Sequence, residues 1–207
     1  MNKCIHVTAI DDYEQEMCLI TIPTIKDYAK KIGADFNFIN KAKFDGFPPN
    51  YERFQIWEDG KKYDWNFNID ADFLIHPDCE DPTNYLDPSY IGALMSFDID
   101  PVFKINKYFI RDGRNTGLSD NYIITSSLTH DLWEPFNGSF EEAQEHCLTS
   151  QKRRVSEFVV SNNMAKYGLK MGGVIHDRTK LYHINRTTDS VKNTVEIARK
   201  ILESWKI

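Results

Sequence analysis

Strand-like and helix-like segments alternate through the first third of this sequence, and that order constrains the fold more than any other feature. Residues 4–10 and 35–40 read as strands, because the first is a short apolar run and the second alternates apolar with polar side chains. Apolar residues recur at helical spacing over 22–32, and a second, short helix is expected over 51–63. A third strand follows at 65–75. This order predicts a parallel sheet with right-handed crossovers.

The remainder of the chain is less regular and mixes further strands with helices. Strands are expected over residues 91–99, 107–110, 121–127 and 180–184, and helices over 139–148, 155–168 and 191–205. Residues 111–120 (RDGRNTGLSD) form a polar segment with two glycines, which is typical of a loop. Pro23 lies near the front of the first helical run and marks either its first turn or a kink. The sequence therefore predicts an α/β protein.

Length and charge limit the classes of function. A chain of 207 residues is long enough for one good core, so a single domain is the default, although this length also fits one module of a longer protein. A formal net charge of -6 argues against a broad surface for nucleic acid or anionic membrane. No apolar run suffices for a membrane span, and the amino terminus turns acidic before a signal peptide could form. The four scattered cysteines indicate a reducing compartment, so a cytoplasmic location is expected.

Two acidic residues interrupt the third predicted strand. Asp70 and Asp72 lie in WNFNIDADFLIHP (65–77), with apolar side chains on both sides. Charge is costly to bury, so these carboxylates need a partner. Alternate residues of a strand point to the same side, about 6–7 Å apart, and ligands of an open parallel sheet bind at the carboxyl ends of its strands. If the strand frays after Ile69, both carboxylates can converge on one cation, and hard oxygen ligands of this kind suit Mg²⁺ or Mn²⁺.

A second Asp-x-Asp tripeptide shows that the pattern alone is a weak signal. Asp98 and Asp100 follow a short apolar run and are cut off by Pro101, so a turn explains them. The first copy differs because apolar strand residues flank it on both sides, where two unpaired acids would be costly. The candidate metal site is therefore the first copy.

An apolar strand that runs into Asp-Ala-Asp resembles the Asp-x-Asp motif of GT-A glycosyltransferases, which transfer a sugar from a nucleotide diphosphate donor. Other segments agree in order: HVTAIDDY (6–13), KDYAKKIGADF (26–36), YERFQIW (51–57) and KLYHINR (180–186). The chain looks most similar to short retaining members related to yeast-type α-galactosyl- and α-mannosyltransferases, and to compact virus-encoded glycosyltransferase domains. The resemblance implies a Rossmann-like mixed sheet flanked by helices in one compact GT-A domain over 1–207. Residues 1–75 would form the nucleotide-binding half and residues 76–207 the acceptor and metal half.

The resemblance also implies where a UDP-sugar donor would lie. The residues expected at the donor are Thr8, Ala9, Tyr13, Arg53, Asp70, Ala71, Arg178, Lys180 and Arg186. An aromatic face suits the planar base, so Tyr13 is expected to stack on it, with a core role as the alternative. The fork of Arg53 suits planar oxyanions, so this residue is expected to pair with the pyrophosphate or with Asp70. The basic residues near the end of the chain would neutralise the leaving diphosphate or are ordinary surface charges.

A third metal ligand is expected from the second half of the chain, because members of the family return a histidine from near the carboxyl terminus. His183 in KLYHINR is the first candidate, and His176 in GGVIHD is its competitor. Some retaining relatives carry His-x-x-Gly-x-x-Lys-Pro-Trp, which this sequence lacks after His183. The expected Mn²⁺ or Mg²⁺ ligands are therefore Asp70, Asp72 and His183.

The expected reaction moves a hexose or deoxyhexose to a hydroxyl of a glycan acceptor. A metal ion and basic residues would stabilise charge on the departing nucleoside diphosphate. An inverting enzyme needs a carboxylate base, whereas a retaining one, which the resemblance favours, lets the leaving phosphate take the proton. Asp120 and Glu157 are the candidate catalytic acids facing the sugar, and a first-turn acid that interacts with its helix dipole is the alternative for Glu157.

Two other classes of function compete with this reading. Phosphohydrolases of the HAD type also use an apolar strand followed by Asp-x-Asp, with the first acid as nucleophile. Their motif normally lies on the first strand, whereas here it lies on the third. A non-catalytic module that binds nucleotide sugars would show the same binding residues without turnover.

Overall fold

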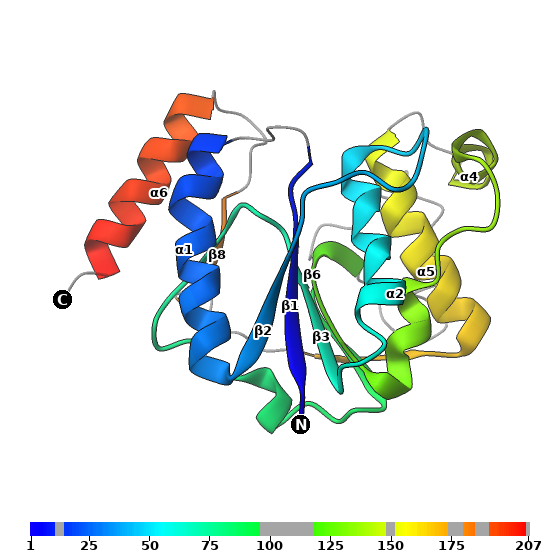
Figure 1. The fold of residues 1–207 in the computed structure, drawn as a ribbon, viewed down its shortest axis with the longest axis horizontal. Helices are drawn as coiled ribbons and strands as arrows, with labels where there is room; N and C mark the ends of the chain where they lie inside the picture. Colours follow the sequence, from blue (N-terminus) through cyan, green and yellow to red (C-terminus); the bar gives the residue numbers. More distant parts are fainter. Residues whose placement is uncertain (11–14, 96–117, 148–151, 174–179, 185–190, 206–207) are drawn as a thin grey trace.

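The central sheet of the computed structural model has six strands in the order β2-β1-β3-β6-β5-β7 (Figure 1). The structure describes residues 1–10, 15–95, 118–147, 152–173, 180–184 and 191–205. β1 (Lys3–Thr8) lies between β2 (Ala34–Ile39) and β3 (Trp65–Ile69), and all three run parallel. The parallel arrangement predicted for the first three strands is confirmed.

The second half of the sheet makes it mixed. β6 (Leu118–Ser126) runs antiparallel to both β3 and β5 (Tyr90–Met95), and β5 pairs in parallel with β7 (Lys170–Gly173). A separate antiparallel sheet joins β4 (Phe73–Ile75) to β8 (Leu181–His183). This small sheet brings the segment after β3 next to a segment from near the carboxyl terminus.

Helices cover both faces of the central sheet (Figure 1). On one side lie α1 (Gln15–Ile32) and α6 (Val191–Trp205), which pack against each other. The other side is covered by α2 (Ile56–Asp59), α4 (Phe140–Cys147) and α5 (Val155–Tyr167). The described 3-10 helices are η1 (Pro49–Gln55), η2 (Pro82–Asn84), η3 (Ser127–Trp133) and η4 (Lys152–Arg154). The predicted class, an α/β single compact domain with a mixed sheet flanked by helices, is confirmed.

The side chains of β3 show how the centre of the sheet is buried on both faces. Its odd-numbered residues belong to the apolar cluster beneath α1, whereas Asn66 and Asn68 face the other way and are also buried. Each amide nitrogen donates to a backbone carbonyl, from Asn66 to Gly60 (3.1 Å) and from Asn68 to Asp120 (2.8 Å). Burial of these amides is tolerable because they are hydrogen-bonded.

Several predicted boundaries change in the structure. The helix expected over 51–63 is the 3-10 helix η1 continued by the short α2, which ends at Gly60 as expected. The strand expected over 65–75 divides into β3 and β4, because residues 70–72 leave the sheet. Pro23 lies in the interior of α1 and not in its first turn, because the helix begins at the polar segment preceding the apolar repeat.

Two expectations for the second half need correction. Residues 111–120 were expected to form a loop, but β6 begins at Leu118, so Asp120 lies in a strand. The polar side chains of this segment do not indicate a strand, but its backbone pairs with β3 and β5.

β7 was not predicted, because two of its four residues are glycines. The strand expected over 107–110 and the second Asp-x-Asp at 98–100 lie outside the described residues. Among the helices that the structure describes, none combines the length and apolarity needed to cross a membrane.

Candidate metal and nucleotide site

The chain leaves the central sheet at Asp70, and this break forms the candidate site. β3 ends at Ile69, and the N–H of Asp70 donates to the carbonyl of Asn121 on β6 (2.8 Å). Residues 70–72 then turn, with the N–H of Phe73 donating to the carbonyl of Asp70 (3.3 Å), before β4 begins. The expected fraying after Ile69 therefore occurs, and it puts both carboxylates at the carboxyl end of β3, where ligands of such sheets bind.

Asp70, Asp72 and His183 meet at this edge, with one ligand atom from each lying within 4.8 Å of the other two. The pairing of β4 with β8 sets His183 opposite Phe73, and the two rings stack with their centroids 4.5 Å apart. Nε2 of His183 lies 3.3 Å from Oδ1 of Asp72, and the side-chain amide of Asn121 lies 3.1 Å from Nδ1. The structure thus brings together the three residues that the sequence predicts as metal ligands.

The chemistry of these three side chains fits a divalent cation. Two carboxylates and an imidazole supply oxygen and nitrogen ligands, and Oδ1 of Asp72 is buried without a hydrogen bond from any described group, despite the nearby imidazole. Burial lowers the pKa of His183, but the contact with Asp72 and the charges of Asp72 and Asp70 outweigh burial and raise it above 6.5. A cation would satisfy the buried oxygen and relieve the crowding of negative charge.

Arg53 is the buried counter-charge of the site. It comes from η1, and its Nη2 lies 3.1 Å from Oδ1 of Asp70. Its Nη1 lies 3.1 Å from Oδ2 of Asp120 on β6. Burial raises the pKa of Asp70 to about 7, with Asp72 and Asp120 adding to the shift and Arg53 opposing it. The predicted pairing of Arg53 with Asp70 is present in the structure.

A small cavity of about 90 Å³ adjoins these acids. It is lined by Thr8, Ala9, Ile10, Pro49, Asn50, Arg53, Asp70, Ala71 and Asp72. The hydroxyl oxygen of Thr8 is buried and has no hydrogen-bond partner among the described groups. The N–H of Ala9 donates to the carbonyl of Ile39 (3.0 Å), so it is used within the fold. The cavity lies between the end of β1, the start of η1 and the turn after β3, which are segments expected to bind the donor.

Asp120 and Glu157 lie near Arg53, on β6 and α5 respectively. Oδ2 of Asp120 accepts a hydrogen bond from Ser156 (2.5 Å) as well as contacting Arg53. Glu157 lies in the first turn of α5, and its two oxygens lie 2.5 and 2.6 Å from Nη1 of Arg154. Burial raises the pKa of Glu157 to about 7, with the charge of Asp120 adding and Arg154 opposing. Both candidate acids are thus close to the site, each already paired with an arginine.

Other predicted site residues are distant from these groups or not described. Tyr13, His176, Arg178 and Arg186 lie outside the described residues. Lys180 precedes β8, and its carbonyl accepts a hydrogen bond from the N–H of His76 (2.8 Å). Because His183 is three residues further along an extended chain, Lys180 lies at the opposite end of β8, about 10 Å away.

Four neutral side chains support the site and were missed in the sequence: Asn50, Asn68, Asn121 and Ser156. One signal was present, because Asn68 occupies a strand with apolar neighbours and a buried amide needs partners. The others come from η1, β6 and α5, and no sequence spacing relates them.

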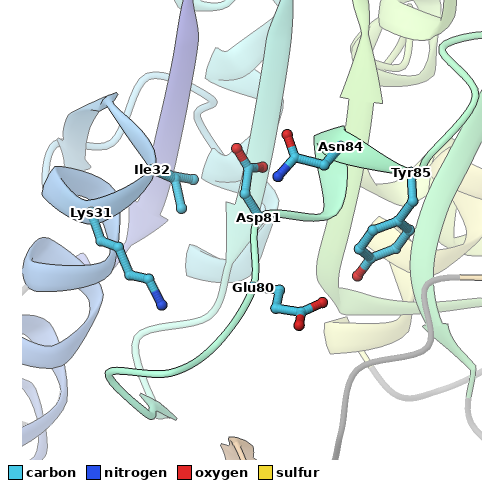
Figure 2. A pocket seen from close by; sticks show the side chains of 6 residues that line it. All are labelled: Lys31, Ile32, Glu80, Asp81, Asn84 and Tyr85. Atoms are coloured by element: carbon cyan, nitrogen blue, oxygen red, sulfur yellow. The ribbon is translucent and has the colours of Figure 1, made fainter.

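A larger cavity of about 370 Å³ lies at the other end of the sheet (Figure 2). Figure 2 shows its lining side chains: Lys31, Ile32, Glu80, Asp81, Asn84 and Tyr85. Asp81 pairs with Lys3, the first residue of β1, which places this cavity at the amino end of the parallel strands. It therefore lies apart from the acidic cluster despite its greater size.

The sheet order, the turn at Asp-Ala-Asp and the return of β8 define the GT-A fold, which the chain shares with solved glycosyltransferases. No protein-family model matches the chain, and no curated protein matches it. Solved structures do match over nearly the whole chain. Because their sequences are only 10–13% identical to this one, the match shows a shared fold and nothing more.

Two solved structures illustrate the likeness. A glycosyltransferase involved in the glycosylation of the major capsid of PBCV-1 has a TM-score of 0.59 and 10% identity, covering 97% of this chain and 100% of that one. The galactosyltransferase LgtC, in complex with donor and acceptor sugar analogs, has a TM-score of 0.53 and 12% identity, covering 96% of this chain and 95% of that one. An active-site mutant of LgtC matches equally well by TM-score, at 0.53.

Proposed function

We propose that this protein is a metal-dependent glycosyltransferase that moves a hexose or deoxyhexose from a UDP-sugar to a hydroxyl of a glycan acceptor. The observation that carries this proposal is the meeting of Asp70, Asp72 and His183 beside the cavity at the ends of β1 and β3. The fold shared with solved glycosyltransferases supports the same class of reaction.

In this proposal the cavity receives the nucleoside end of the donor. Thr8 has an unused buried hydroxyl there, which can bond a polar group of the base or ribose. Ala9 and Ala71 line the same cavity without large side chains, and Tyr13 would stack on the base. Arg53 presents positive charge toward Asp70 and the expected position of the pyrophosphate.

The proposed metal site is formed by Asp70, Asp72 and His183, which would hold Mn²⁺ or Mg²⁺. The bound ion supplies positive charge at the diphosphate, which favours departure of the nucleotide. Arg178, Lys180 and Arg186 remain proposed contributors to the same neutralisation. The chain's own part is to keep two carboxylates and one imidazole within 4.8 Å of one another, ready for the ion.

We propose a retaining transfer, in which the bond from the anomeric carbon to the phosphate oxygen breaks while the acceptor oxygen bonds to the same face. The acceptor proton passes to the leaving phosphate, so no carboxylate base is needed. Glu157 and Asp120 are proposed to face the donor sugar. The pairing of each acid with an arginine favours orientation of the sugar over proton transfer.

The test combines binding and turnover. Thermal stabilisation by UDP with Mn²⁺, together with release of UDP from UDP-sugars, is expected for the wild-type protein and should vanish in Asp72→Asn. Asp78→Asn is the matched control, because this acid is exposed and lies beyond β4. Equal stabilisation of wild type and Asp72→Asn, or no response to any nucleotide sugar, would contradict the proposal.

The same experiment separates the competing functions. Release of inorganic phosphate from simple phosphoesters would indicate a HAD-type hydrolase, which the shared fold does not favour. Metal-dependent UDP binding with no UDP release in the presence of varied sugar acceptors would indicate a binding module.

A further inference from the structure

Arg53 lies in a closed ring of hydrogen bonds that reaches beyond the candidate metal ligands. Its Nη1 contacts Asp120 at Oδ2 (3.1 Å) and also donates to the Asp120 carbonyl. Its Nε donates to the carbonyl of Asn50 (2.7 Å). The side chain of Asn50 donates to the hydroxyl of Ser156 (2.7 Å), and that hydroxyl donates to Oδ2 of Asp120 (2.5 Å). The ring therefore joins η1, β6 and α5.

The ring leaves only one edge of the guanidinium for Asp70. With Nε and Nη1 held by the ring, Nη2 alone contacts Asp70, at 3.1 Å from Oδ1. Arg53 and Ser156 are 3% and 0% exposed, so water does not compete for these bonds. This single contact orients the Asp70 carboxylate but does not form a bidentate pair with it, so the carboxylate can still bind a cation.

We propose that Ser156 and Asn50 are positioning residues that hold Arg53 and Asp120 in this ring and so keep the Asp70 carboxylate available to the divalent cation. This inference rests on the metal site of the proposed function. Their described hydrogen bonds lead to the cation ligands through Arg53: Asn50 bonds Ser156 and, through its carbonyl, Arg53, and Ser156 bonds Asp120. Charge balance gives the reason: Asp70 and Asp120 share one buried arginine, while Asp72 lies beside His183.

Loss of the ring should weaken cation binding more than it destabilises the fold. Without the Ser156 hydroxyl, Asp120 loses a hydrogen bond that helps to retain Arg53. The guanidinium can then turn both Nη groups toward Asp70 as a bidentate pair, which competes with a cation for the same oxygens. The expected effect is therefore weaker cation binding.

Mn²⁺ binding measured by calorimetry at pH 8, without nucleotide, tests the proposal. Ser156→Ala should weaken Mn²⁺ affinity about tenfold, the usual effect of losing one hydrogen bond to a charged group. Ser161→Ala is the matched control, because Ser161 is equally buried on the same helix and bonds only the carbonyl of Glu157 among the contacts described here. Asn50→Ala should weaken binding in the same direction and keeps the test open if Ser156→Ala folds poorly.

A double-substitution cycle separates positioning from general damage. If Ser156 acts through Asp120, adding Ser156→Ala to Asp120→Asn should cause little further loss of Mn²⁺ affinity. The Nε–H signal of Arg53 in NMR spectra of the metal-free protein should be protected from exchange in wild type and Ser161→Ala but not in Ser156→Ala. Arg53→Lys identifies this signal by removing it.

The outcomes distinguish the two proposals. Wild-type affinity in Ser156→Ala, or independent effects of Ser156→Ala and Asp120→Asn, would overturn the positioning role alone. A wild-type protein with no affinity for Mn²⁺ would overturn the metal site and, with it, this role.

Discussion

Nε2 of His183 lies 3.3 Å from Oδ1 of Asp72, although the two residues come from opposite halves of the chain. The contact exists because β4 and β8 pair in a small sheet of their own, which sets His183 beside the turn after β3. A histidine and two acids held this way form a site that neither half of the chain contains alone.

Replacement of His183 by alanine should abolish most of the Mn²⁺-dependent stabilisation by UDP. Loss of a ligand should lower metal affinity by at least about 10–100-fold, the range seen when merely supporting groups are removed. Thermal shift with a Mn²⁺ titration is the measurement. Tyr182→Ala is the control, because this neighbouring residue on β8 is exposed. Equal Mn²⁺ responses of the two variants would show that His183 is not a ligand.

Asp70→Asn should separate stability from metal binding. The amide has the shape of the carboxylate but removes one of three acids crowded around Arg53, so the metal-free protein should be at least as stable as wild type. Addition of Mn²⁺ should raise the melting temperature of the wild type but not of the variant. A variant that is much less stable without metal would mean that the pair with Arg53 serves mainly to hold the fold.

Arg53→Ala should cost about 3–5 kcal/mol of unfolding free energy, because it leaves buried carboxylates without their counter-charge. Urea denaturation gives the value. Lys61→Ala removes an exposed pair with Glu58 (2.7 Å) and should cost less than about 1 kcal/mol. Similar losses for both variants would contradict the buried electrostatic role assigned to Arg53.

His6 makes the stability of the protein depend on pH. Its Nε2 lies 2.9 Å from the Asn66 amide oxygen, and Nδ1 lies 3.1 Å from the Asn37 amide nitrogen, which together fit the neutral ring. Burial lowers the pKa of His6 to about 4, whereas the unfolded chain takes up the proton near 6.5. Stability from this group is therefore complete above pH 6.5 and falls by about 3 kcal/mol as the pH drops toward 4.

Urea denaturation of wild type and His6→Gln at several pH values between 4 and 7.5 measures this effect. Because Asp70 and Glu157 also titrate in this range, the contribution of His6 is the difference in unfolding free energy between wild type and His6→Gln, which should fall by about 3 kcal/mol as the pH drops from 7.5 to 4. A difference between the two proteins that stays constant over this range would show that His6 does not contribute to the pH dependence.

The order of the first strands and helices could be predicted because their signals are local. Apolar runs and helical spacing identify β1, α1, β2 and β3, and the charge cost of Asp70 and Asp72 marks where a ligand belongs. His183 was indicated only through the resemblance to GT-A glycosyltransferases, with His176 as its competitor. The other inferences needed only neighbouring residues or the order of elements along the chain.

The surroundings of Asp120 could not be predicted, because its contacts join three elements with no common sequence spacing. Its segment, 111–120, looks like a loop in sequence because it is polar and holds two glycines, yet β6 already begins at Leu118. Ser156 and Asn50 belong to common residue types whose hydrogen bonds depend on which neighbours the fold supplies.

The α/β class, the strand that carries Asp-Ala-Asp and the candidate carboxylate ligands Asp70 and Asp72 follow from the sequence, because periodicity and the cost of burying charge are properties of short segments. The tertiary structure was needed to show that β8 brings His183 to Asp72 and that Arg53 is shared between Asp70 and Asp120. Those contacts arise from strand pairing and burial between distant segments, and their geometry exists only once the sheet has formed.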